Sequence, residues 1–166
     1  GGSIFCKSRV GEGSSFWFTI NFQVSALDVA QLYVKPLELV SLKRPIQVLI
    51  AEDSPTNQMV IRNFLENSGC KTDIVETGEQ AVQAVKKTTY DIVFMDCQMP
   101  IMDGYQASRI IREQESSASS RLPIIAFTAG AMKGDRERCL EAGMDDYLSK
   151  PIQIEALNAI LQRWVN

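Results

Sequence analysis

Residues 91–104 read DIVFMDCQMPIMDG, in which four apolar residues, Ile92–Met95, are followed at once by Asp96. A short apolar run between polar residues is typical of a strand that is buried on both faces. The segment closes on Asp103 and Gly104, which indicate a turn and the start of a helix. These residues therefore predict a buried strand that carries a carboxylate at its carboxyl end.

The same alternation of apolar runs and amphipathic stretches extends from Ile46 to the end of the sequence. Strands that alternate with helices are typical of an α/β fold, in which helices cover both faces of a parallel sheet. We expect five strands and five helices. The strands are predicted at 48–50, 71–75, 92–95, 124–127 and 147–148, and the helices at 55–68, 78–87, 104–115, 135–142 and 153–164.

The first 23 residues differ from this pattern. Glycines and serines between Gly11 and Ser15 indicate a turn, and the alternating run from Phe16 to Phe22 predicts a strand with aromatic side chains on one face. We therefore expect a β-hairpin over 1–23, which needs a partner surface because an isolated hairpin is marginally stable. Residues 24–45, which include Pro36 and Pro45, are interpreted as a linker to a domain at 46–166.

Composition excludes several classes of function. The 166 residues are 45% hydrophobic and 22% charged, which suits one full domain plus an appendage. A net charge of -3 and a pI near 5.1 argue against a nucleic-acid partner. The sequence has no histidine. This excludes Ser-His-Asp and Cys-His hydrolases and histidine-ligated zinc sites within this chain.

The four cysteines, Cys6, Cys70, Cys97 and Cys139, show no CxxC spacing, which fits a reducing compartment without disulfides. We expect Cys97 to fill space rather than react, because a neighbouring carboxylate disfavours the thiolate. No apolar run approaches the roughly 20 residues that span a bilayer, and the N-terminus lacks the charged-then-apolar pattern of a signal peptide. We therefore expect this segment to be cytoplasmic and to make no membrane contact.

Polar residues follow the predicted strands. Glu52 and Asp53 follow the first, Asp96 the third, Thr128 the fourth and Lys150 the fifth. The carboxyl ends of parallel strands border one crevice, so these side chains should converge. Clustered carboxylates need a cation between them, and an oxygen-only site suits Mg²⁺. The set is suited to a carboxylate nucleophile that accepts a phosphoryl group, with the metal and the lysine offsetting charge.

Residues 46–166 resemble a receiver domain of two-component signalling. The resemblance rests on four motifs in order, together with Asn57 after the first and Met102–Gly104 after the second. The motifs are VLIAED at 48–53, DIVFMDCQMP at 91–100, PIIAFTA at 123–129 and AGMDDYLSKP at 142–151. This resemblance implies a flavodoxin-like fold with strand order 2-1-3-4-5.

The resemblance also implies roles for individual residues. Asp96 would be the phosphoacceptor, and Asp53 a direct Mg²⁺ ligand. Glu52 would reach the metal directly or through water, and the backbone carbonyl of Gln98 would be a further ligand. Thr128 and Lys150 would contact the acyl phosphate. Tyr147 would be an aromatic switch, and Pro151 would follow a cis peptide bond. One departure is the glutamate at position 52, where aspartate is commoner.

The implied partners and activity follow from the same resemblance. Asp96 would receive its phosphoryl group from a phosphohistidine on a kinase dimerisation domain, with a histidine phosphotransfer protein as a further candidate recipient. The domain would catalyse its own phosphorylation and dephosphorylation. The hairpin at 1–23 resembles the closing strand pair of a histidine-kinase ATP-binding domain. The parent would then be a hybrid histidine kinase, and the remnant lacks the boxes needed to bind ATP.

Two other functions compete with this interpretation. A receiver-like module could regulate a kinase by docking alone, without phosphorylation; loss of an acidic or lysine position would favour it, and none is missing. A phosphatase of the haloacid dehalogenase type would need a DxD motif after the first strand, where this sequence has Glu52, Asp53 and Ser54.

Overall fold

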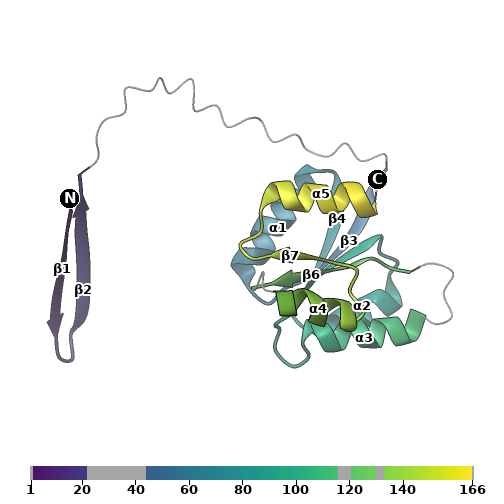
Figure 1. The fold of residues 1–166 in the computed structure, drawn as a ribbon, viewed down its shortest axis with the longest axis horizontal. Helices are drawn as coiled ribbons and strands as arrows, with labels where there is room; N and C mark the ends of the chain where they lie inside the picture. Colours follow the sequence, from purple (N-terminus) through teal and green to yellow (C-terminus); the bar gives the residue numbers. More distant parts are fainter. Residues whose placement is uncertain (1, 22–43, 116–120, 130–132, 166) are drawn as a thin grey trace, which may run out of the picture. The chain divides into compact units, whose positions relative to one another are not determined.

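The computed structural model describes residues 2–21, 44–115, 121–129 and 133–165. They form two units, a hairpin and an α/β domain (Figure 1). The predicted linker at 24–45 lies outside the described residues except for Arg44 and Pro45. Among the described helices, none is both long enough and apolar enough to cross a membrane.

The hairpin consists of β1 (Gly2–Arg9) and β2 (Gly13–Ile20), paired antiparallel. Its turn uses Gly11 and Gly13, whose φ angles of 81° and 94° favour glycine. The predicted hairpin is therefore confirmed.

The aromatic residues of the hairpin occupy both of its faces. Phe16 and Phe18 share one face, as expected. Trp17 points to the other face and stacks on Phe5 with ring centroids 5.7 Å apart. The expectation of aromatic side chains on a single face is therefore wrong for Trp17, because side chains alternate along a strand. All residues of both strands are exposed, so an apolar face of the hairpin remains uncovered in the described residues.

The α/β domain has five parallel strands in the order β4-β3-β5-β6-β7, which is the expected 2-1-3-4-5 arrangement (Figure 1). All five strands and five helices fall where the sequence predicts them. The strands are β3 (Ile46–Ala51), β4 (Cys70–Val75), β5 (Ile92–Asp96), β6 (Ile124–Thr128) and β7 (Asp146–Ser149). The helices are α1 (Pro55–Asn67), α2 (Gly78–Lys87), α3 (Gly104–Glu115), α4 (Lys133–Glu141) and α5 (Ile154–Trp164).

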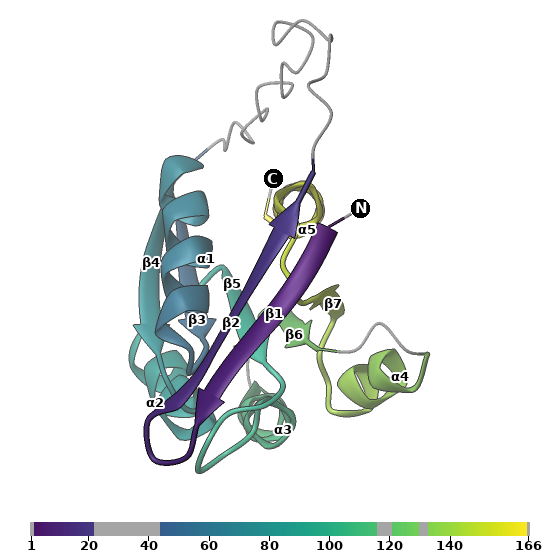
Figure 2. The ribbon, with the colours of Figure 1, turned by 90° about the vertical axis from the view of Figure 1, so that its left-hand side faces the viewer.

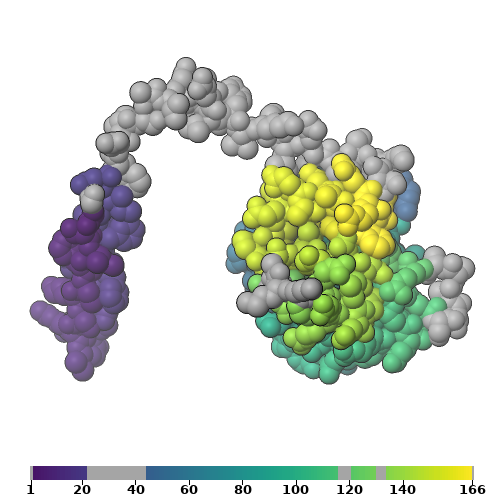
Figure 3. Space-filling view, viewed as in Figure 1, coloured from purple at the N-terminus to yellow at the C-terminus, as the bar shows by residue number. Residues whose placement is uncertain are grey.

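The core lies in two layers because successive strand residues face opposite sides of the sheet. Val48 and Ile50 pack in one layer with residues of α1 and α5. Leu49 and Ala51 pack in the other layer with residues of α2, α3 and α4. Figures 1 and 2 both place α2 and α3 side by side, away from α5, and α5 forms the yellow surface in Figure 3. The fold is thus doubly wound, with the carboxyl ends of its central strands free to form a site.

Candidate functional site

Three carboxylates meet at the carboxyl ends of β3 and β5. Glu52 and Asp53 follow β3, and Asp96 is the last residue of β5. Each of the three carboxylates has one oxygen atom that lies within 4.8 Å of an oxygen atom of each of the other two. Glu52 is fully buried and Asp96 nearly so, whereas Asp53 is exposed. The convergence predicted from the strand ends is therefore present.

Lys150 connects the two buried carboxylates. Its Nζ lies 2.6 Å from Oδ2 of Asp96 and 2.8 Å from Oε2 of Glu52. The backbone N–H of Lys150 donates to the carbonyl of Thr128 at 2.7 Å, which ties the residue to the end of β6. The peptide bond from Lys150 to Pro151 is cis, as predicted.

Further hydrogen bonds fix the two carboxylates. The Asn57 side chain, from the first turn of α1, donates to Oε1 of Glu52 at 2.9 Å. The backbone N–H of Gln98 donates to Oδ1 of Asp96 at 3.1 Å. The sequence places Asn57 after the first motif but does not predict that it anchors Glu52. Its signal is a polar side chain in the first turn of a helix that follows the acidic strand end.

Burial and pairing set the charge of these groups. Burial, together with the negative charge of Glu52, raises the pKa of Asp96 above its usual value despite the hydrogen bonds from Lys150 and Gln98. For Lys150, burial lowers the pKa, but the hydrogen bonds to Asp96 and Glu52 and the charges of these carboxylates together outweigh it, and the net shift is upward. Lys150 therefore remains a cation at neutral pH.

The charge balance at the site leaves room for a divalent cation. Three carboxylates face one ammonium group, so negative charge is in excess. Mg²⁺ prefers oxygen ligands at about 2.0–2.1 Å and commonly takes one or two protein carboxylates together with water and phosphate oxygens. Glu52, Asp53 and Asp96 lie close enough together, with small adjustments, to provide such ligands. The donor set therefore fits Mg²⁺.

The other predicted residues lie on the segment after β5, at the end of β6 and on β7. Thr128 is buried at the end of β6, and the Gln98 side chain is exposed. Both line a hollow of about 680 Å³ next to the site, together with Cys97, Tyr105 and Arg138. Tyr147 is half-buried on β7, where it pairs with Ala126 of β6. The site is thus flanked on its β6 side by a hollow that a small molecule can enter.

The hollow also borders a contact that the sequence analysis did not anticipate. Sγ of Cys97 lies 3.8 Å from Sγ of Cys139, a residue of α4, and both thiols are free. The hydrogen bond to Cys139 and burial raise the pKa of Cys97 well above its usual range. At Cys97 itself, this agrees with the expectation that a thiolate is disfavoured.

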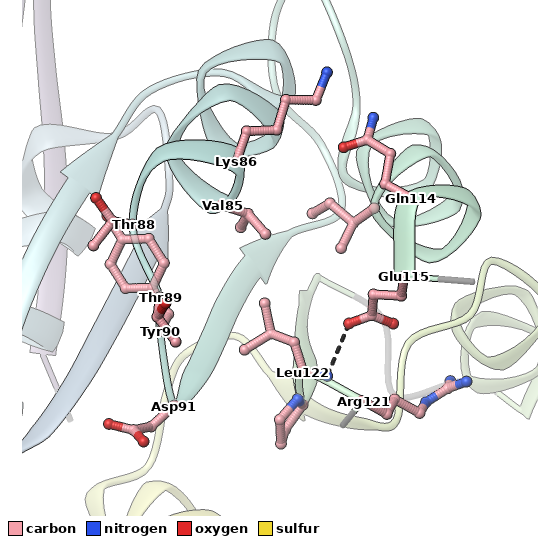
Figure 4. Close-up of a pocket in the computed structure, with 12 residues that line it drawn as sticks. Val85, Lys86, Thr88, Thr89, Tyr90, Asp91, Gln114, Glu115, Arg121 and Leu122 are labelled. Carbon is pink, nitrogen blue, oxygen red and sulfur yellow. Dashed lines mark hydrogen bonds between the residues drawn. The ribbon is translucent and has the colours of Figure 1, made fainter. Parts of the chain in front are cut away.

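A second hollow, of about 550 Å³, lies at the opposite end of the sheet. Figure 4 shows it between the carboxyl ends of α2 and α3, where the Leu122 N–H donates to the Glu115 side chain at 2.8 Å. Its lining includes Tyr90, Asp91 and Arg121 but none of the predicted site residues. The predicted site therefore lies at the carboxyl end of the sheet, away from this hollow.

Comparisons with known proteins agree with this arrangement. Residues 48–162 match the family described as "Response regulator receiver domain". The sensor protein EvgS of Escherichia coli (strain K12) is 35% identical over 162 residues, which cover 98% of this chain. The chain spans only 13–14% of the length of the bacterial sensor proteins that it matches.

Two solved structures are similar to the α/β domain. One is the receiver domain of the sensor histidine kinase PA1611 from Pseudomonas aeruginosa PAO1, with a magnesium ion coordinated in its active-site cleft. It is 48% identical with a TM-score of 0.67, and the match covers 74% of this chain and 98% of that one. The other is the receiver domain of the Saccharomyces cerevisiae response regulator Ssk1, crystallised with the histidine phosphotransfer protein Ypd1. It is 30% identical with a TM-score of 0.70, covering 73% and 89% of the two chains.

Proposed function

This chain belongs to the response regulator receiver domain family, and we propose that its Asp96 accepts a phosphoryl group from a phosphohistidine in a Mg²⁺-dependent reaction. The domain is a receiver of the two-component phosphorelays in which hybrid histidine kinases take part.

The cluster of Asp96, Glu52 and Lys150 is the observation that supports the proposal most strongly. An Asp96 carboxylate oxygen forms a bond to phosphorus while the P–N bond of the donor breaks, and the bonding electrons leave with the imidazole. The ammonium group of Lys150 lies 2.6 Å from Oδ2 of Asp96. It can therefore pair with the oxygens of the transferred phosphoryl group. Thr128 at the end of β6 supplies a hydroxyl on the neighbouring side.

The metal part of the proposal rests on the donor set. Glu52, Asp53 and Asp96 would hold Mg²⁺, with the backbone carbonyl of Gln98 as a further ligand. When bound, the ion neutralises charge on the transferred phosphoryl group. Glu52 is kept in place for this by Asn57. The magnesium ion in the receiver of PA1611 supports the assignment.

Exposed apolar residues on α1, which begins shortly after Asp53, and on the segment after β5 suggest where a phosphodonor docks. Met59 and Val60 on α1 are 58% and 50% exposed, and Ile101, five residues after Asp96, is 83% exposed. Apolar surface of this kind is commonly covered by a partner protein. We propose that the phosphohistidine domain of a kinase, or a histidine phosphotransfer protein like the one bound to Ssk1, covers it.

The hairpin and the segment after it have a proposed origin in a kinase. We propose that residues 1–23 are the closing strands of a kinase ATP-binding domain, that 24–45 form a linker and that the receiver comprises 46–166. The uncovered face that carries Phe16 and Phe18 is what a strand pair removed from a larger domain would present. The match to EvgS, which covers 98% of this chain, supports the same order of segments.

The test is phosphorylation of the full chain by acetyl phosphate and Mg²⁺, followed by intact-mass measurement. We expect the mass to rise by one phosphoryl group, and EDTA to abolish the rise. Asp96→Asn should remain unmodified, whereas the matched variant Asp135→Asn on α4 should be phosphorylated like the native chain.

Beryllofluoride provides an independent measurement, because it occupies an aspartyl-phosphate site without phosphoryl transfer. A native chain that acetyl phosphate leaves unmodified and whose fluorescence beryllofluoride does not alter would overturn the proposal. Such a result would favour the docking module that acts without phosphorylation.

A further inference from the structure

Two buried thiols lie in contact beside the phosphoacceptor. Cys97 directly follows Asp96, and its Sγ lies 3.8 Å from that of Cys139 on α4. The two residues are 3% and 1% exposed. Cys70 packs in the other core layer, with α1 and α5, and Cys6 belongs to the hairpin. Within the described α/β domain, Cys97 and Cys139 are therefore the two thiols that can react with each other.

This contact is the point at which α4 meets the core. The helix reads KGDRERCLE, and between 134 and 141 Cys139 is its one buried side chain. Its partner Cys97 lies at the end of β5, where the N–H of Cys97 donates to the carbonyl of Phe127 at 3.0 Å. The thiol pair thus links a polar surface helix to the residue next to Asp96.

The pair lies beside a hollow, although both of its side chains are almost fully buried. Cys97 lines the hollow of about 680 Å³ that also contains Tyr105 and Arg138. The guanidinium of Arg138 lies 4.9 Å from the ring centroid of Tyr105 and adds positive charge there.

We propose that Cys97 and Cys139 are a site of reversible oxidation, at which a hydroperoxide converts the two thiols to an intramolecular disulfide. The sulfur of one thiol attacks a peroxide oxygen and the O–O bond breaks. The departing hydroxide takes up the proton of that thiol, so a sulfenic acid and water are formed. The second thiol attacks the sulfenic sulfur and releases a second water, so two thiols and one hydrogen peroxide give one disulfide and two waters.

The geometry requires little movement for this reaction. A disulfide bond is about 2.05 Å long, so the sulfurs must approach by less than 2 Å from their separation of 3.8 Å. A shift of α4 can provide this approach, because Cys139 is the one buried side chain of the helix between 134 and 141. The disulfide would attach α4 covalently to the residue that follows Asp96. In a reducing compartment such a bond is transient, as is typical of redox-sensing cysteines.

The test uses the full chain treated with hydrogen peroxide, in the native form and as Cys6→Ser, which removes the exposed thiol. We expect the mass of Cys6→Ser to fall by two hydrogens and the tryptic peptides carrying Cys97 and Cys139 to be joined. Dithiothreitol should restore the original mass. Cys139→Ala should yield no joined peptide.

Peptide mapping of the native chain needs no core substitution, so it remains decisive even if Cys139→Ala folds poorly. Exposed Cys6 reports whether the peroxide has reacted. Recovery of both Cys97 and Cys139 as free, alkylatable thiols after Cys6 is fully oxidised would overturn the proposal. So would a bond from either of them to Cys6 or Cys70 in place of the proposed pair.

Discussion

The backbone of Gly104 lies directly against the main-chain carbonyl of Asp96. A β-carbon at position 104 would fall well inside van der Waals contact with that oxygen and 2.9 Å from the carbonyl carbon. The N–H of Gly104 also donates to the carbonyl of Cys97 at 3.3 Å. The start of α3 is thus packed onto the strand end that carries the phosphoacceptor, with no space for a side chain.

Gly104→Ala should therefore damage both stability and the site. We expect the free energy of unfolding to fall by roughly 2 kcal/mol, the typical cost of overpacking a buried contact. Phosphorylation by acetyl phosphate should also slow, because Asp96 must shift away from the new methyl group. Urea denaturation and intact-mass kinetics measure the two effects.

Gly134→Ala is the matched control. Gly134 lies on α4, where an added β-carbon meets nothing within 4 Å. Alanine is the better helix former, so this variant should be as stable as the native chain or more stable, by up to about 1 kcal/mol. Equal stability of Gly104→Ala and Gly134→Ala would contradict the close approach of α3 to Asp96.

Lys150→Met tests the charge balance of the site. It leaves Glu52 and Asp96 buried together without their cation, and we expect a loss of roughly 3 kcal/mol in the presence of EDTA. Mg²⁺ should recover more stability in this variant than in the native chain, because the ion no longer competes with the ammonium group. Urea denaturation in EDTA and in Mg²⁺ gives both quantities.

Lys86→Met, on the exposed face of α2, is the control and should change stability by less than about 0.5 kcal/mol in either condition. The expectation for Lys150 fails if Lys150→Met is as stable as the native chain in EDTA. It also fails if Mg²⁺ stabilises the two proteins equally.

The sequence predicted the site because its residues follow directly from local patterns. Asp96 and Thr128 each end an apolar strand, and parallel strands bring such ends together whatever the details of packing. The order of the strands, by contrast, came from the resemblance to receivers. Apolar runs alone indicate which residues form strands but not which strands are neighbours.

Contacts that depend on packing between distant segments could not be predicted. Cys97 and Cys139 are 42 positions apart, and their contact depends on how α4 lies on the sheet. Arg112 pairs with Asp145 at 2.6 Å for the same kind of reason, since α3 and the segment before β7 meet only in the folded domain. Nothing in the local sequence of these residues distinguishes them from other polar or small side chains.

Asp91→Asn should reveal a stabilising ion pair at the start of β5. The hydrogen bond from Arg44 keeps the pKa of Asp91 below its usual range, helped by the N–H of Gln47. A carboxylate whose pKa is lower in the folded state stabilises the fold above its unfolded pKa, about 3.9. That stability is lost as the pH falls through the folded value. Native and variant chains should therefore differ most near pH 7 and converge below pH 4.

Urea denaturation at a series of pH values measures this difference. Glu137→Gln, on the exposed surface of α4, is the control, and its stability should stay close to that of the native chain throughout. A difference between Asp91→Asn and the native chain that persists undiminished at the lowest pH would show that the charge of Asp91 is not its cause.

Met59→Glu should separate docking from chemistry. Met59 lies on α1, is 58% exposed and is not among the groups that face Asp96, so phosphorylation by acetyl phosphate should be unchanged. A charge placed in an apolar protein interface typically costs more than 1 kcal/mol, so transfer from a phosphorylated histidine phosphotransfer protein should slow by about 10-fold. Leu140→Glu on α4, which is 41% exposed, is the matched control and should leave both reactions unchanged.

Both donors transfer their phosphoryl group to Asp96, but only the protein donor needs a docking surface. Slowing with both donors would therefore mean that Met59 acts on the site itself. Slowing with neither would place the protein donor elsewhere on the domain.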